Sequence, residues 1–327
     1  MSQPESFDEA PPAKRRRMDM ESTITRSDIW HNDGSVVLQA ERKQFRVHWG
    51  VLCLHSAFFR DLQGLPQPPT DQSSVEGCPV VELHDSSTDV KYLLKALYDP
   101  LLFSKESLHF ALIAAIVRPG RKYDFKNLLA AAVQRLTHEN PTSLEKYESS
   151  YHIANNQIIY SPKQIHDGGC LTFDTITLAW ENNLFAILPC AYFRAVFFYD
   201  QETILDGIPR DNGLPATLSA QDQRLCILGS KRIVQAQWEL ERLWNWLSSD
   251  DGCTGNEGCT VWKSTVFRRL VKTQAPLAPF SLPRNLKMCI ACATKHAEIV
   301  LEARKKLWDQ LPVFFDLPPW AELKNDS

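Results

Sequence analysis

At residues 36–48 the chain reads Val-Val-Leu-Gln-Ala, then Glu-Arg-Lys-Gln, then Phe-Arg-Val-His. The two outer runs are rich in β-branched and aromatic residues, and the four residues between them are polar. This arrangement predicts two strands joined as a hairpin. From Gly50 the apolar residues recur at helical spacing, so we expect the hairpin to lead into a helix over residues 51–62.

Further along the chain, the apolar pattern predicts one more strand and several helices. Residues 80–83 form a short β-branched run, and the Pro- and Ser-rich residues 64–78 before it predict a loop. Helices are expected at 87–98, 108–117 and 124–138, with a break at Pro119-Gly120. Because short strands come first and helices follow, the pattern indicates an α+β fold.

Beyond residue 145 the strand signal nearly vanishes, and helices are expected at 175–183, 186–198, 219–247, 262–273 and 284–311. The sequence therefore predicts a polar, disordered tail at 1–25, an α+β domain at 26–142 and a mainly α-helical domain at 143–323. No segment repeats at a fixed period, so neither a solenoid nor a propeller is expected.

Composition narrows the function classes. The chain has 327 residues, of which 44% are hydrophobic and 23% charged, and its net charge is -3. This small net charge gives the chain no electrostatic field strong enough to favour direct nucleic-acid binding. No apolar run reaches the roughly 18–20 residues that span a bilayer, and the N-terminus lacks the order of a secretory signal. We expect a soluble protein of the nucleus or cytoplasm whose nine cysteines are reduced.

The polar tail contains one basic cluster, Lys14-Arg15-Arg16-Arg17. An exposed basic tetrad in a disordered segment is typical of a nuclear import signal, because it can lie extended along an acidic receptor groove. A solvated charge run without function is the alternative.

Several segments together resemble BTB/POZ domains, and most closely those of the large group of BTB proteins in mushroom-forming fungi. The likeness rests on the hairpin at residues 36–48 and on six other segments. These are Ser27-Asp28-Ile29-Trp30, Asp33-Gly34, His55-Ser56, Phe58-Phe59, Val81-Glu82-Leu83-His84-Asp85 and Gly120-Arg121-Lys122-Tyr123-Asp124-Phe125. It extends into the C-terminal half, at Leu188-Pro189-Cys190-Ala191-Tyr192 and at residues 311–320.

The resemblance implies a non-catalytic interaction module, acting as a scaffold or regulator, that pairs with itself or with another BTB protein. Many members also present a helical surface to a cullin-type scaffold of a ubiquitin ligase, so a substrate adaptor is an alternative. The basic cluster Lys14–Arg17 and the cysteines described below favour a third alternative, a zinc-dependent nuclear regulator. Aromatic residues concentrate binding energy at interfaces, which makes Trp30, Phe58 and Phe59 the expected dimer contacts. In BTB transcription factors a buried Asp beside a basic residue helps recruit corepressors; Asp28 matches the Asp, but Trp49 replaces the basic partner.

No arrangement of residues points to catalysis. Cys53 and His55 are two positions apart, and on a helix such residues face different directions. No glycine-rich phosphate loop occurs in the sequence. His48, on an apolar strand, is expected to be structural. We therefore expect no enzymatic activity.

Four cysteines have a spacing that suits a metal ion. Cys253 and Cys259 flank five residues of a Gly-rich loop, and Cys289 and Cys292 form a C-x-x-C pair. Convergence of the two pairs would complete a tetrahedral shell for one structural zinc, with His296 as a reserve ligand. The five-residue gap is longer than in common zinc knuckles, so packed free thiols remain the alternative.

Overall fold

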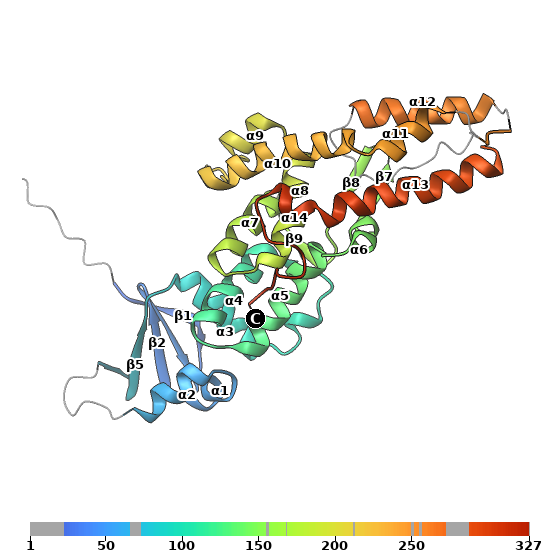
Figure 1. The fold of residues 1–327 in the computed structure, drawn as a ribbon. Helices are drawn as coiled ribbons and strands as arrows, with labels where there is room; N and C mark the ends of the chain where they lie inside the picture. The colour runs from blue at the N-terminus through green and yellow to red at the C-terminus, as the bar shows by residue number, and fades with distance from the viewer. Residues whose placement is uncertain are drawn as a thin grey trace, which may run out of the picture.

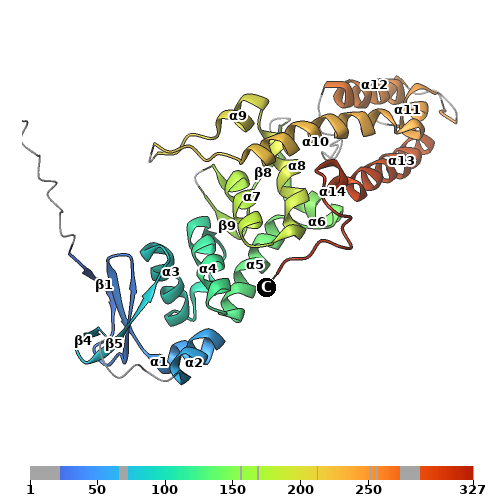
Figure 2. The ribbon, with the colours of Figure 1, turned by 60° about the vertical axis from the view of Figure 1, so that its left-hand side comes forward.

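The structure is a computed structural model, and it describes residues 23–65, 73–154, 157–167, 169–211, 213–249, 252–254, 257–272 and 288–326. The molecule is elongated, with a β-sheet at one end and the long helices α12 (Glu257–Lys272) and α13 (Ile290–Asp309) at the other (Figure 1). Turning the view shows the helices between residues 87 and 198, α3–α8, stacked between these two ends (Figure 2). Within the described residues, no helix is both long and apolar enough to cross a membrane.

Five strands form the sheet, in the spatial order β1-β3-β2-β5-β4. Their bounds are Thr25–Trp30 (β1), Val36–Ala40 (β2), Lys43–Val47 (β3), Ser74–Val75 (β4) and Cys78–Leu83 (β5). The predicted hairpin is confirmed, because β2 and β3 pair antiparallel with Val36 opposite Val47. Glu41 adopts a positive φ of 53° in the turn, which lets the chain reverse within two residues.

The single helix expected after the hairpin is instead two helices, α1 (Trp49–His55) and α2 (Ala57–Gly64). Ser56 separates them with an extended backbone, and its hydroxyl accepts a hydrogen bond from Phe59 N as the N-cap of α2. The same hydroxyl donates to Tyr123 O at 2.6 Å. Apolar spacing continues across this break, so periodicity alone could not reveal it.

Three helices follow, α3 (Ser87–Tyr98), α4 (Phe110–Lys122) and α5 (Lys126–Glu139), with a 3₁₀ turn η1 at Leu102–Ser104 and strand β6 at Leu108–His109. The expected break at Pro119-Gly120 is wrong, because Pro119 lies inside α4. Proline removes one backbone hydrogen bond and crowds the preceding turn. Here α4 packs against both α3 and α5, and this burial keeps the helix intact to Lys122.

The C-terminal part is mainly helical, as predicted, but the near absence of strands is wrong. Strands β7 (Tyr151–Ala154) and β8 (Gln157–Tyr160) form a hairpin, and β9 (Ile165–His166) pairs with β6. The expected long helix over 219–247 is divided into α10 and α11. The remaining elements are α6 (Leu144–Ser149), α7 (Leu171–Glu181), η2 (Phe185–Ile187), α8 (Leu188–Phe198), α9 (Gln201–Asp206), α10 (Ala220–Trp238), α11 (Glu241–Ser248), α12 (Glu257–Lys272), α13 (Ile290–Asp309) and α14 (Leu311–Phe314).

Two apolar cores hold these elements. The smaller core lies between the sheet and helices α1–α3 and includes Val36, Leu38, Phe45, Leu52, Phe59 and Leu94. The larger core starts on α4 and α5 and continues to the C-terminus, including Ile113, Leu136, Phe173, Tyr192, Trp262 and Phe315. It crosses residue 142 without interruption, and the domain boundary expected there stays a prediction.

Candidate functional site

The surface of α1 and α2 carries apolar side chains that stay exposed among the residues that the structure describes. Leu54 on α1 is 72% exposed and Phe58 on α2 is 40% exposed. The Phe58 ring packs edge-on against Phe59 and Tyr123, with ring centroids 5.3 and 5.1 Å away. Phe58 is thus held in place from below while its outer face stays open. We call Leu54 and Phe58 the α1–α2 face.

The three predicted interface residues do not share one environment. Phe59 is only 1% exposed and belongs to the smaller core, so it is a core residue rather than an interface residue. Trp30 is partly exposed on β1, an edge strand of the sheet, with the Arg26 guanidinium 4.4 Å from its ring centroid. Phe58 alone combines exposure with rigid support.

Asp28 is more exposed and better paired than the sequence led us to expect. Its side chain is exposed and lies 2.7 Å from Lys91 Nζ on α3, while the Ser27 hydroxyl donates to it at 2.9 Å. The hydrogen bond from Lys91, followed by that from Ser27, lowers the pKa of Asp28 to about 2. Trp49 supplies no basic partner, as expected from the sequence, but a lysine from another element, Lys91, takes that place beside Asp28.

Cys53 and His48 have structural partners. The Cys53 thiol lies 3.2 Å from Gln63 Oε1 and 3.5 Å from Phe59 O, and burial raises its pKa above the ordinary value. An activated nucleophile requires the opposite shift. His48 contacts the Tyr98 hydroxyl at 3.0 Å through Nδ1 and Asp33 at 3.2 Å through Nε2. The basic cluster Lys14–Arg17 lies outside the described residues.

At the other end of the molecule, the structure brings the four cysteines together. Cys253 lies in a loop, Cys259 in the first turn of α12, Cys289 at the N-cap of α13 and Cys292 in the first turn of α13. Their Sγ atoms all lie within 4.8 Å of one another. Cys259, expected in the Gly-rich loop, is in fact helical and buried.

Backbone amides point at two of the sulfur atoms. Cys289 N donates to Cys259 Sγ at 3.2 Å, and Cys292 N donates to Cys289 Sγ at 3.4 Å. Hydrogen bonds from Thr254, first from its side chain and then from its backbone, lower the pKa of the Cys289 thiol to about 5. Burial raises the pKa of the neighbouring Cys292 thiol to about 12. The cluster therefore favours a thiolate at Cys289 first.

The loop that carries Cys253 depends on a glycine. Gly252 has a positive φ of 74°, a conformation that side chains other than glycine rarely adopt. A Cβ at this position would also lie 3.3 Å from Lys295 Nζ, so the α13 lysine approaches the loop backbone closely.

His296, the expected reserve ligand, lies outside the group of four sulfurs. Its ring meets Trp262 edge-on, with centroids 4.2 Å apart, and its buried Nε2 has no hydrogen-bond partner among the residues that the structure describes. Burial lowers the pKa of His296 to about 4, so the ring is neutral at physiological pH.

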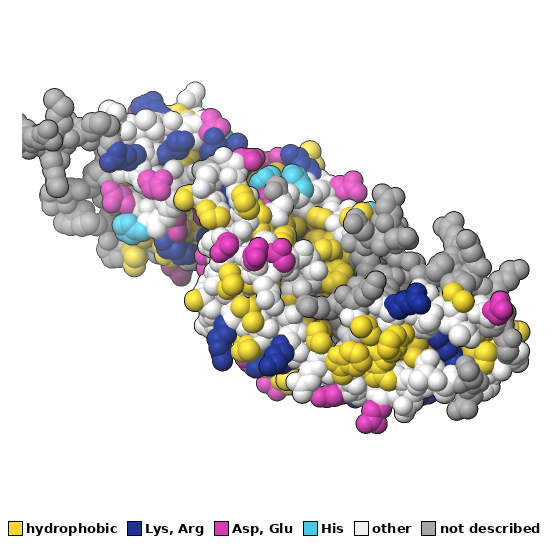
Figure 3. Space-filling model, turned by 90° about the horizontal axis from the view of Figure 1, so that it is seen from above, with side chains coloured by type: hydrophobic (Ala, Val, Ile, Leu, Met, Phe, Trp, Pro, Cys, Tyr) yellow, Lys and Arg dark blue, Asp and Glu magenta, His cyan; other side chains and the backbone are white. Residues whose placement is uncertain are grey.

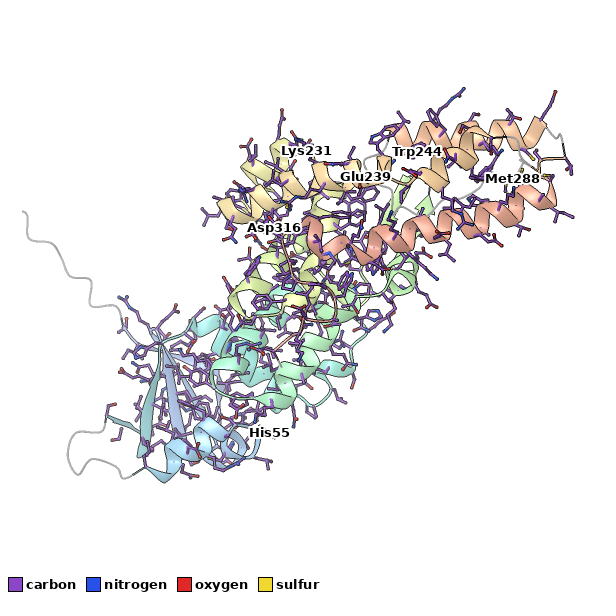
Figure 4. The ribbon with its side chains drawn as sticks, viewed as in Figure 1. His55, Lys231, Glu239, Trp244, Met288 and Asp316 are labelled. Carbon is purple, nitrogen blue, oxygen red and sulfur yellow. The ribbon has the colours of Figure 1, made fainter. Side chains whose placement is uncertain are left out.

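In Figure 4, Met288 lies at the tip of the molecule, where the chain enters α13, and Trp244 lies on the side of α11.

The donor set fits a soft, tetrahedral metal ion. Four thiolates suit zinc, and bonds of about 2.3 Å place neighbouring sulfurs about 3.8 Å apart. The observed limit of 4.8 Å requires a contraction of at most about 1 Å, which side-chain rotation can supply. The cluster can therefore hold a metal ion without rearrangement of the helices.

Comparison with known families concerns the sheet end of the molecule. Residues 33–140 match the family model of the BTB/POZ domain. This part of the chain is a BTB/POZ domain. No curated protein matches the chain closely enough to count as a relative. BTB/POZ domains are non-enzymatic protein–protein interaction modules, and they commonly self-associate or bind cullin-type partners.

Two features of these sites escaped the sequence reasoning. Leu54 is the most exposed large apolar residue described in the BTB domain, and its position two residues after the buried Leu52 places it on the opposite side of α1. That spacing was a usable signal. Thr254, whose hydrogen bonds lower the pKa of Cys289, gave no sequence signal, because Cys289 lies 35 positions away.

Proposed function

We propose that the chain is an interaction protein, a scaffold or regulator, whose BTB/POZ domain pairs with a second copy of itself through the α1–α2 face. The observation that carries the proposal is the exposed position of Leu54 and Phe58 on a domain of an interaction family. Exposed aromatic and aliphatic side chains with rigid support are the usual anchors of protein interfaces. Burial of both on dimerisation removes this apolar surface from water.

Sedimentation velocity of the full chain over a range of concentrations tests the proposal. We expect a Kd for dimerisation of about 1 μM, which corresponds to about 8 kcal/mol. At tens of micromolar (roughly ten times this Kd or more) the protein should therefore be mostly dimeric. Leu54→Asp should shift the protein to monomer, because a buried carboxylate at the interface has no partner. Leu214→Asp is the matched control: Leu214 is 73% exposed but lies outside the BTB domain, so this variant should stay dimeric. A monomeric wild type, or a dimeric Leu54→Asp variant, contradicts the proposal.

Affinity purification with mass spectrometry separates the roles open to such a scaffold. A cullin in the eluate makes the protein a substrate adaptor of a ubiquitin ligase. Chromatin factors in the eluate favour a nuclear regulator. That role also requires nuclear import, which we propose Lys14–Arg17 drives. The similarity of residues 188–192 and 311–320 to BTB proteins of mushroom-forming fungi supports membership of that group.

A further inference from the structure

We propose that Cys253, Cys259, Cys289 and Cys292 bind one structural zinc ion, which ties α12 to α13. All four ligands are sulfur atoms, so the ion would have a complete tetrahedral shell from protein side chains alone. Catalytic zinc sites keep one position for water or substrate. A closed shell of thiolates therefore assigns the ion a structural role.

The surroundings of the cluster match what thiolate ligands need. Amide N–H groups of Cys289 and Cys292 point at the sulfurs, and hydrogen bonds to ligand atoms orient them and disperse their charge. Four thiolates and Zn²⁺ together carry two negative charges. The two amide N–H groups offset part of that charge.

The four cysteines lie where a metal ion would stabilise the contact between α12 and α13. We call α11, α12 and α13 the arm; it forms the end of the molecule opposite the sheet (Figure 1). Within the arm, α11 packs against both α12 and α13. Helix α12 leaves Val261, Phe267 and Val271 about half exposed, so its burial is incomplete. An ion that joins the first turn of α12 to the start of α13 fixes both helix ends directly.

The chemical alternatives are two disulfides or four packed thiols. None of these four described cysteines forms a disulfide in the structure, and their mutual distances allow either outcome. Intact mass under denaturing, non-reducing conditions detects a disulfide, because each disulfide removes two hydrogens. Zinc and disulfides exclude one another here, since each uses the same sulfur atoms.

Elemental analysis of the purified full chain is the first test, with one zinc per chain expected. Cys259→Ser and Cys289→Ser should each lose most of the metal. Cys53→Ser is the control, because Cys53 is partly buried in the BTB domain and outside the cluster; it should retain a full equivalent. Cobalt substituted for zinc should give the visible absorption of a tetrahedral thiolate site.

A second measurement keeps the proposal testable if the serine variants fail to fold. Hydrogen exchange of the wild-type chain, before and after chelation, should show faster exchange in the arm and unchanged exchange in α3–α5, because metal binding orders only the elements that it ties. Reduced wild-type protein that neither contains zinc nor takes it up overturns the proposal. So does an intact mass that shows two disulfides among these cysteines.

Discussion

At the sheet end, side chains from strands and helices form a core almost completely shielded from water, whereas α12 at the opposite end leaves three large apolar side chains about half exposed. Seen from above, hydrophobic side chains gather on the surface over the arm and the adjoining part of α10 (Figure 3). Trp238 of α10 and Trp244 of α11 stack with ring centroids 4.7 Å apart, and Phe267 of α12 meets Trp244 edge-on at 5.8 Å. The arm also buries large side chains such as Trp246 and Trp262, but one side of α12 stays open to water.

The difference teaches that one chain can stabilise its two ends by different means. Burial of apolar surface contributes about 25 cal/mol per Å², so an end that buries less surface gains less from it. In the arm, four cysteines lie at the point where α12 and α13 begin. Substitutions at the two ends should therefore have separable effects.

The largest effect in this comparison is expected from Phe59→Ala. The Phe59 ring is fully buried among Phe125, Tyr123 and Trp49, so its removal leaves a cavity in the smaller core. Such substitutions lower the free energy of unfolding by about 3–5 kcal/mol. Urea unfolding followed by hydrogen exchange should place the loss in the BTB domain and leave the arm unchanged.

Phe58→Ala is the matched control for that variant, since Phe58 is adjacent in sequence but partly exposed. It should cost clearly less stability while weakening self-association. Equal losses of stability in the two variants would show that exposure does not distinguish the two rings. A loss that spreads into the arm would show that the two ends unfold together.

A smaller effect is expected in the core between the two ends, from Gly229→Ala. A Cβ at position 229 on α10 would overlap the ring of Phe315, which is fully buried. Alanine favours a helix by about 1 kcal/mol over glycine, but overpacking of a core costs about 1–3 kcal/mol. We therefore expect net destabilisation in urea unfolding. Gly50→Ala is the control, because no atom lies near its added methyl group; it should be neutral or stabilising.

Local signals explain how much of this architecture could be predicted. The β2–β3 hairpin and helices α3 and α5 were found because strand and helix periodicities are set by neighbouring residues. The cysteine cluster could be suspected for a similar reason: C-x-x-C places two thiols in one helical turn, and only the meeting of the two pairs needed the fold. The boundary between α10 and α11 had no glycine or proline to mark it.

Long-range contacts explain most of what was missed. The β7–β8 hairpin carries Tyr151 and Tyr160, which enclose the buried Arg194 of α8. The Arg194 guanidinium lies 3.7 Å from the Tyr160 ring centroid and donates to Tyr151 Oη at 2.9 Å and to Asn140 Oδ1 at 3.2 Å. A buried charge requires such partners. Nothing near residues 151–160 in sequence shows that an arginine more than thirty positions away needs them.

The smallest expected effect concerns a surface charge pair at the BTB end, Asp28 with Lys91. Because the folded-state pKa of Asp28 is lowered to about 2, the unfolded chain binds more protons at pH values between about 2 and 4. The pair's contribution is thus present above pH 4 and is lost as the pH falls through 2. Asp28 is exposed, so solvent screening limits that contribution to less than about 1 kcal/mol.

Carboxyl NMR titration of Asp28 measures this effect more directly than unfolding does. In the wild type the carboxyl should titrate near pH 2, and in Lys91→Gln it should titrate clearly higher, because Lys91 is the largest cause of the shift while the Ser27 hydrogen bond remains. High salt should raise the wild-type pKa part of the way. Lys95→Gln is the control: Lys95 Nζ lies 4.0 Å from Asp28, so its removal should move the pKa much less. An unchanged pKa in Lys91→Gln would mean that the Ser27 hydroxyl, rather than a charge from α3, holds the carboxylate at this edge of the sheet.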